Sequence, residues 1–213
     1  MKSSKQKAVG TPFYRFIRIL GALFSFLVYP CQLINAQAAD IKSPFILLCN
    51  HQSMMDPILL AVKLKQHEIH FIGKRELTNF KPLKWIVEHL HMIAVSRHMS
   101  DLSAMRAAGE VLKAGQVLGI FPEGKRSQGV PMEQIESGVS LLALRYRIPL
   151  LPVFIAGRPR PFIKVKMIAA PPIQFEDLLS AGIDMKASGL LNARIQQVYY
   201  DLYKKYIINT TVA

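Results

Sequence analysis

One short segment of the chain contains residues that could carry out proton transfer. Between Asn50 and Pro57 the sequence reads Asn-His-Gln-Ser-Met-Met-Asp-Pro, which places His51 five residues before Asp56. An imidazole titrates near neutral pH and can accept a proton, and a carboxylate within reach can hold it in a productive orientation. We therefore predict that His51 is a general base and that Asp56 orients it. The alternative is that Asp56 only caps a helix and His51 is an ordinary loop histidine.

A second segment could bind the polar groups of a substrate. Residues Phe121–Ser127 read Phe-Pro-Glu-Gly-Lys-Arg-Ser. The proline and Gly124 favour a turn, and a glycine lets a substrate approach the backbone closely. Glu123, Lys125 and Arg126 supply charge of both signs, so this loop could hold a phosphate and a hydroxyl together. The alternative is a polar turn whose charges are simply solvated.

Both segments follow apolar runs that are typical of buried strands. Pro44–Cys49 precedes the first segment and Val117–Ile120 precedes the second. Asp56 is expected as the N-cap, and Pro57 as the first residue, of a helix that continues through Val62. Ligands of open α/β sheets bind at the carboxyl ends of the strands, so the two segments are expected to meet in one crevice.

The rest of the chain alternates between strand and helix patterns. Strands are expected over Phe45–Cys49, Ile69–Ile72, Met92–Val95, Val117–Phe121, Leu151–Ile155 and Ile163–Ile168. Helices are expected over Pro57–Lys65, Leu83–Leu90, Leu102–Lys113, Gly138–Arg147 and about Lys186–Ile207. This order predicts a single-domain α/β fold with a largely parallel sheet flanked by helices. A chain of 213 residues is long enough to bury such a core.

The N-terminal segment is basic and apolar. The whole chain has a net charge of +13, and residues 1–39 contain no acidic residue. The apolar run Ile19–Tyr29 follows the basic residues, but it is shorter than the ~20 residues of a membrane span. We predict that residues 1–40 form a membrane-associating helical segment that lies in, or is partly inserted into, an anionic membrane surface. A secretory signal peptide ending near Ala36–Ala38 and an ordinary core helix are the alternatives.

A second tract without acidic residues lies between Glu136 and Glu176. Its basic residues are Arg145, Arg147, Arg158, Arg160, Lys164 and Lys166. Such a tract could bind a polyanion, including nucleic acid. However, the chain contains no helix-turn-helix or zinc-finger pattern and little of the aromatic interleaving of single-strand binders. A membrane surface therefore fits better, and no nucleic-acid partner is expected.

In the order of its motifs, the chain resembles the glycerolipid acyltransferases, specifically the 1-acylglycerol-3-phosphate acyltransferases. The resemblance extends from about Pro44 to Gly157. It rests on four motifs, found at His51–Asp56, at Lys74–Leu77 with a following segment that ends in Arg97, at Phe121–Ser127 and at Ile148–Val153. Two positions depart from the family pattern: Ser96 replaces the usual aspartate, and Ile135–Gly138 lacks a lysine-rich Lys-x-Gly segment.

The resemblance implies acyl transfer from a thioester to the free hydroxyl of 1-acylglycerol-3-phosphate, which gives phosphatidic acid. An alcohol needs a base to remove its proton, and His51, oriented by Asp56, would be that base. The acceptor hydroxyl attacks directly, so no enzyme serine is needed, and the chain lacks a Gly-x-Ser-x-Gly elbow. By similarity, the substrate-binding residues would be Lys74, Arg97, Glu123, Gly124 and Arg126. The two arginines would bind the phosphate, whereas Glu123 and the Gly124 backbone would arrange the glycerol.

No metal or cofactor is expected, and acyl-CoA or acyl carrier protein would be the co-substrate. His67 and His70, like His89 and His91, lack acidic or cysteine partners that would complete a metal site. The two cysteines do not suggest a disulfide scaffold. Residues 41–213 would form the acyltransferase domain, at the cytoplasmic face of a membrane. Two alternatives stay open: another lysolipid acceptor, or a non-catalytic basic protein that binds lipid or polyanions.

Overall fold

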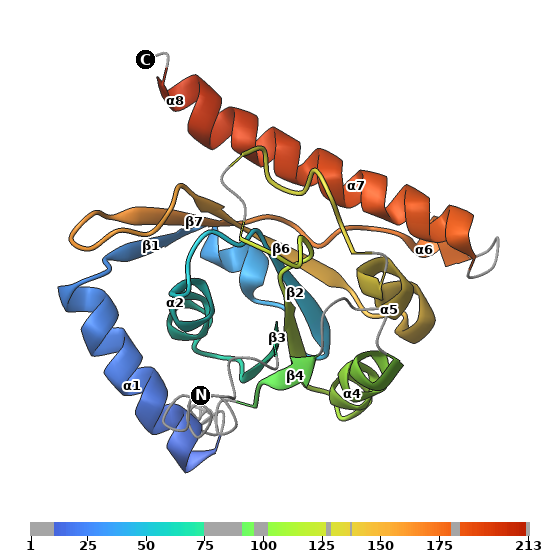
Figure 1. Cartoon of the computed structure of the whole chain (residues 1–213), viewed down its shortest axis with the longest axis horizontal. Coiled ribbons are helices and arrows are strands. Elements are labelled where there is room, and N and C mark those ends of the chain that lie inside the picture. The colour runs from blue at the N-terminus through green and yellow to red at the C-terminus, as the bar shows by residue number, and fades with distance from the viewer. Residues whose placement is uncertain are drawn as a thin grey trace, which may run out of the picture.

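A mostly parallel sheet forms the centre of the protein (Figure 1). The computed structural model describes residues 11–74, 91–95, 102–126, 129–136, 138–179 and 184–211. Within these ranges, seven strands form one sheet in the order β1-β7-β6-β2-β5-β3-β4. Their bounds are β1 Cys31–Ile34, β2 Phe45–Cys49, β3 Ile69–Lys74, β4 Ile93–Val95, β5 Val117–Ile120, β6 Leu150–Ala156 and β7 Val165–Ala169. All neighbouring strands pair in parallel except β6 and β7, so the predicted largely parallel α/β sheet is confirmed.

Helices cover both faces of this sheet (Figure 1). Their bounds are α1 Pro12–Leu27, α2 Asp56–Lys63, α4 Leu102–Lys113, α5 Gly138–Tyr146, α6 Glu176–Leu179, α7 Met185–Tyr203 and α8 Asn209–Thr211. A short 3-10 turn, η1, spans Ala36–Ala39, and a π-helical turn, η3, spans Lys204–Ile208 between α7 and α8. Helices α1 and α2 lie on one side of the sheet, whereas α4, α5 and α7 lie on the other.

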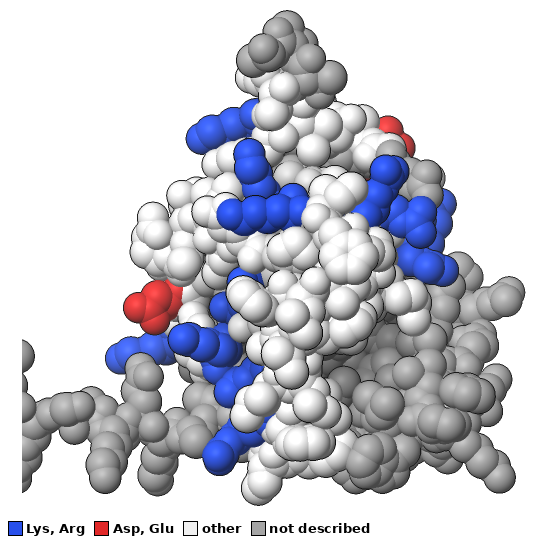
Figure 2. Space-filling model, turned by 90° about the vertical axis from the view of Figure 1, so that its left-hand side faces the viewer, with Lys and Arg blue, Asp and Glu red and all other residues white. Residues whose placement is uncertain are grey.

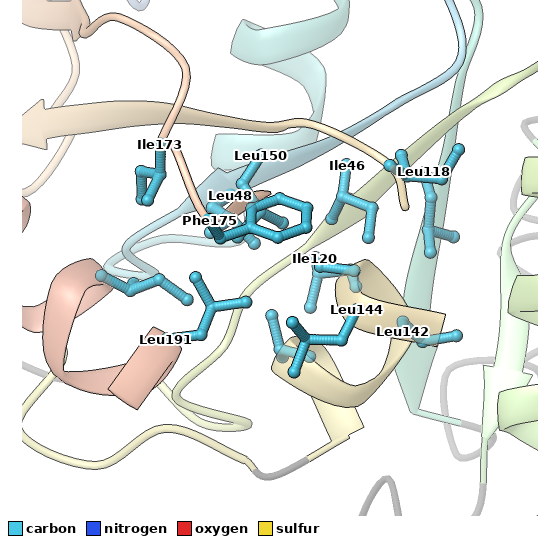
Figure 3. Packing of buried hydrophobic residues seen from close by; sticks show 14 of the residues in the cluster. Ile46, Leu48, Leu118, Ile120, Leu142, Leu144, Leu150, Ile173, Phe175 and Leu191 are labelled. Atoms are coloured by element: carbon cyan, nitrogen blue, oxygen red, sulfur yellow. The ribbon is translucent and has the colours of Figure 1, made fainter. Parts of the chain in front are cut away.

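Strand β2 contributes to a separate core on each face because its side chains alternate in direction. Ile46 and Leu48 pack into the core beneath α4, α5 and α7, which Figure 3 shows at close range. Phe45, Leu47 and Cys49 pack into the core beneath α2. All five residues are fully buried, as the continuous apolar run predicts for a central strand.

Several elements differ from the sequence expectations. Strand β1 and the short helix α6 were not expected, and β1 is an edge strand that pairs with β7. The last expected strand starts at Val165, because Ile163 belongs to the preceding turn. The C-terminal helix is interrupted by η3 rather than continuous. The expected helix Leu83–Leu90 lies outside the described residues.

Helix α1 is attached to the domain along one side only. The buried Tyr14 hydroxyl accepts the backbone N–H of Ile69 at 3.2 Å, and Arg18 donates to the Lys65 carbonyl at 2.6 Å. The helix approaches α2 closely at Gly21, where a Cβ atom would lie 3.1 Å from Ile58 Cγ2. Its exposed large apolar side chains are Phe16, Ile19, Leu20, Leu23, Phe24, Phe26 and Leu27. Thus α1 is not an ordinary core helix, and in the described part of the chain no helix has the length and apolar character to cross a membrane.

Candidate active site

His51 and Asp56 are paired at the carboxyl end of β2. His51 Nδ1 lies 2.9 Å from Asp56 Oδ2, and the carboxylate is fully buried whereas the imidazole is partly exposed. The same Asp56 oxygen accepts the backbone N–H groups of Gln52 and Ser53 at 2.7 and 2.8 Å. Because the carboxylate can only accept at Nδ1, the neutral ring carries its proton there and leaves Nε2 free to accept another.

The prediction that Asp56 is the N-cap of α2 is wrong. Asp56 is the first residue of the helix and Met55 is the N-cap. The carboxylate points back to the preceding loop, where its contacts with the backbone of Gln52 and Ser53 fix the path of residues 51–55. The aspartate therefore orients the loop as well as the imidazole.

The second motif lies directly beside His51, as expected. Strands β2 and β5 are parallel neighbours, with Leu48 opposite Ile120, so both motifs leave the same edge of the sheet. The Phe121 ring stacks on His51 with 4.2 Å between ring centroids. Phe71 of β3 stacks on Phe121, with 5.8 Å between the ring centroids. The imidazole is thus held between a buried carboxylate and an aromatic wall.

Glu123 connects the two motifs through the backbone. It is 8% exposed, and its Oε2 accepts the His51 N–H at 3.0 Å. Its Oε1 accepts the Met132 N–H, also at 3.0 Å. The carboxylate therefore joins the β2 loop to the loop that follows β5, and hydrogen bonds to ionised groups are among the stronger ones. A direct contact between Glu123 and the acceptor glycerol stays a prediction.

Of the other predicted site residues, Gly124 and Arg126 lie in the loop after β5. Gly124 has φ +63°, and a Cβ atom there would lie 3.0 Å from Glu136 Oε1, so the turn requires a glycine. Its N–H donates to the Phe121 carbonyl at 3.1 Å. Arg126 follows in the same loop and is exposed. Lys74 ends β3 without a described side chain, and Arg97 lies outside the described residues.

Asn50, which was not predicted to have a role, holds the end of β2 in place. Its buried side chain donates to the Ile155 carbonyl at 3.0 Å and accepts the Ile155 N–H at 2.7 Å. The amide therefore continues the β2–β6 ladder one residue past Cys49. From α7, the Tyr199 hydroxyl donates to the Leu48 carbonyl at 2.7 Å. The sequence signal for this role was the position of Asn50, a polar residue directly between a buried strand and His51.

An apolar groove lies next to this site, between α1, α2 and β3. It contains about 390 Å³ of empty space, partly open to solvent. Its lining residues are Tyr14, Ile17, Arg18, Pro57, Ile58, Ala61, Val62, Ile69 and Phe71. Phe71 also stacks on Phe121, the ring that stacks on His51, and Pro57 directly follows Asp56, so the groove lies near the pair. Most of its lining side chains are apolar, and apolar side chains predominate in ligand-binding pockets.

Among the described residues, no group of three or more His, Cys, Asp or Glu side chains could hold a metal ion. His91 Nε2 lies 2.9 Å from Glu68, and the His91 ring packs 4.9 Å from that of His70. Burial and the neighbouring His91 lower the pKa of His70 to about 4. Cys31 and Cys49 are both free, and burial raises the pKa of the Cys49 thiol.

The chain is similar to several known proteins. Residues 31–156 match the family described as Acyltransferase. The chain is 30% identical over 124 residues to the 1-acyl-sn-glycerol-3-phosphate acyltransferase of Bacillus subtilis, an overlap of 58% of this chain and 61% of that protein. It is 25% identical over 151 residues to the chloroplastic enzyme BAT2 of Brassica napus, an overlap of 68% of this chain and 43% of that protein. The chain thus spans less than two thirds of the length of these relatives.

The fold is also found in a solved structure. The crystal structure of the 1-acyl-sn-glycerophosphate acyltransferase of Thermotoga maritima matches with a TM-score of 0.68 and 23% identity. The match covers 90% of this chain and 78% of that one, and at this identity it shows the fold alone. The family match includes the His51–Asp56 pair and the Phe121–Ser127 loop. This chain therefore belongs to the Acyltransferase family.

Proposed function

We propose that this protein transfers an acyl chain from acyl-CoA or acyl carrier protein to the free hydroxyl of 1-acylglycerol-3-phosphate, which gives phosphatidic acid. The observation that carries the proposal is the His51–Asp56 pair, 2.9 Å apart, with an apolar groove nearby that Pro57 and Phe71 help to line. The names of the relatives supply the substrate class.

In this reaction His51 acts as the general base. Its Nε2 accepts the proton of the acceptor hydroxyl while the hydroxyl oxygen attacks the thioester carbonyl carbon. Buried Asp56 stabilises the imidazolium that forms, because its carboxylate lies against the protonated Nδ1. When the carbon–sulfur bond breaks, the imidazolium returns the proton to the departing thiolate. The products are phosphatidic acid and a free thiol, and no covalent enzyme intermediate is needed.

Cationic side chains around the same edge would bind the acceptor. Strands β5, β3 and β4 are parallel neighbours, so the chain leaves each of them at the edge where His51 lies. Arg126 follows β5, Lys74 ends β3, and Arg97 comes two residues after the end of β4. We assign the phosphate to Arg97 and Arg126, because guanidinium groups offer paired donors. Lys74 would add a further positive charge to this site.

The protein is proposed to work on an anionic membrane surface at the cytoplasmic side, where the thioester donors occur. Helix α1 supports this, because it exposes large apolar side chains along most of its length and carries Arg15 and Arg18. Figure 2 shows the side of the molecule that bears α1, where basic side chains surround uncharged surface and acidic side chains are few. A helix of this kind lies in the interface, with its apolar face among the lipid chains.

An acyl-transfer assay tests the proposed function. Thiol release from an acyl thioester is measured in liposomes with and without 1-acylglycerol-3-phosphate, for the wild type, His51→Ala and the surface control Met185→Gln. Met185 is 71% exposed at the start of α7 and belongs to neither motif. We expect release that requires both the acceptor and His51 and that is normal in the control.

The other outcomes of this assay point to different functions. Release without an acceptor would indicate a thioesterase. Transfer only to acceptors without a phosphate would move the assignment to another lysolipid. Absence of release with every acceptor would favour a protein that binds lipid or polyanions without catalysis.

A further inference from the structure

The loop between β6 and β7 exposes two large apolar side chains. Phe162 is 77% exposed and Ile163 is 57% exposed. Burying such side chains stabilises a protein, so an exposed pair at a loop tip is a cost unless something covers it. Phe162 also has φ +62°, a conformation that bulky residues rarely adopt and that glycine or asparagine would adopt more readily. Backbone strain of this kind is found where function requires it.

This loop is attached to the end of α1 by backbone hydrogen bonds. The Phe162 N–H donates to the Val28 carbonyl at 2.6 Å, and the Val165 N–H donates to the Pro30 carbonyl at 2.9 Å. The last turn of α1 exposes Phe26 and Leu27. We call Phe26, Leu27, Phe162 and Ile163 together the tip surface. It is built from two segments that lie more than 130 residues apart in the chain.

The tip surface is flanked by positive charge. Arg158, Arg160, Lys164 and Lys166 are all exposed on the loop or at the start of β7. The sequence contains no acidic residue between Glu136 and Glu176. The surface is therefore complementary to a partner that is apolar within and anionic at its boundary. A bilayer with acidic headgroups has this character, and each basic side chain near it strengthens binding.

The topology places this loop on the catalytic side of the sheet. Strand β6 is parallel to β2, with Val153 opposite Cys49, so β6 also ends at the edge where His51 lies. Ala156 ends β6 three residues further on, or roughly 10 Å beyond Cys49 at the rise of an extended strand. The hairpin therefore extends past the catalytic edge.

We propose that the β6–β7 loop inserts Phe162 and Ile163 into an anionic bilayer as a second attachment point beside α1, so that the catalytic edge faces the lipid surface. The inference rests on the proposed function only in that the acceptor is a membrane lipid. Two attachment points hold a protein in one orientation, whereas one helix alone leaves it free to turn about the helix axis.

Binding to vesicles tests the insertion without any need for turnover. The full chain is sedimented with vesicles of phosphatidylcholine and of phosphatidylcholine with phosphatidylglycerol. We compare Phe162→Asn with Ile163→Thr as a double variant against Met185→Gln. Asparagine tolerates φ +62°, so the loop keeps its shape. We expect at least about tenfold weaker binding of the double variant to the anionic vesicles, since two buried side chains are lost, and unchanged binding of the control.

A second readout reports insertion directly. Phe162→Trp and Met185→Trp are each bound to vesicles that contain bromine-labelled lipid, and the wild type, with its single tryptophan, gives the baseline. We expect added quenchable fluorescence from Phe162→Trp only, because α7 begins on the side of the molecule away from α1 (Figure 1). Unquenched emission from Phe162→Trp, or vesicle binding by the double variant equal to that of the wild type, would overturn the proposal.

The outcomes separate this inference from the proposed function. Quenching together with absent acyl transfer would support the loop and refute the enzyme. Normal transfer in detergent by a protein that does not bind anionic vesicles would refute the loop alone. Loss of transfer from acyl carrier protein in the double variant, with its vesicle binding intact, would overturn the proposal and show that the tip surface contacts the carrier protein instead of lipid.

Discussion

Replacing Asn50 by alanine should destabilise the protein and lower its activity together. The side chain makes two buried hydrogen bonds to the backbone of Ile155, at 2.7 and 3.0 Å. Alanine would leave one N–H and one carbonyl of Ile155 without a partner. A buried polar group that loses its partner costs about 1–3 kcal/mol, so we expect a loss of roughly 2–6 kcal/mol in the free energy of unfolding.

The same substitution should also lower kcat, because Asn50 directly precedes His51. Urea unfolding gives the stability change, and initial rates of acyl transfer at saturating acceptor give the effect on kcat. Asn50→Asp provides a second, isosteric comparison, since it keeps the volume and the acceptor for the Ile155 N–H. However, it faces the Ile155 carbonyl with a carboxylate, so it should also be destabilised. A loss below about 1 kcal/mol in Asn50→Ala, with kcat unchanged, would refute the idea that this amide holds the catalytic edge in place.

Asp56→Asn should lower kcat by about 10³–10⁴-fold with little change in KM, because the amide cannot stabilise protonated His51. Initial-rate kinetics checks this prediction. A loss of kcat below about tenfold would contradict it. The His70 pKa of about 4 lies below that of the unfolded chain, so the unfolded state binds the proton first as the pH falls. The stability that depends on this group is complete above pH ~6.5, and about 3 kcal/mol is lost as the pH falls through 4. The free energy of unfolding, measured with urea between pH 7 and 4, should therefore depend less on pH in His70→Gln than in the wild type. Equal pH dependence of the two proteins would refute the role assigned to His70. Tyr199→Phe removes the hydrogen bond to the Leu48 carbonyl and should cost about 1 kcal/mol of stability by thermal unfolding, whereas an unchanged melting temperature would show that this bond contributes nothing.

Short-range patterns predicted most of the sheet. The run Phe45–Cys49 is apolar at every position, and such a run satisfies a strand that is covered on both faces. Leu102–Lys113 was predicted with its observed bounds, because its apolar residues recur with the helical period. The interval between His51 and Asp56 indicated their pairing for a similar reason. Five residues and a turn are enough to bring the two side chains together, as the 2.9 Å contact shows.

The elements that the sequence did not predict depend on distant partners. Strand β1 has only four residues, and Cys31–Ile34 forms a strand because it pairs with β7, more than 130 positions later. The direction of the Asp56 carboxylate was misjudged because the N-cap preference assumes that only the helix offers N–H groups. Here the loop before α2 offers two further N–H groups, those of Gln52 and Ser53, and the Asp56 carboxylate accepts both of them.

By itself, then, the sequence determined the alternation of strands and helices, the two polar loops at strand ends and the pairing of His51 with Asp56. These features depend on a few neighbouring residues, because the spacing of apolar residues and the residue types in turns determine local structure. Only the tertiary structure decided that Asn50 pairs with Ile155, 105 residues away, and that a groove forms between α1, α2 and β3. It also decided that Phe162 lies at the end of α1. Such contacts depend on the order of strands in the sheet, and that order is set by the packing of the whole chain.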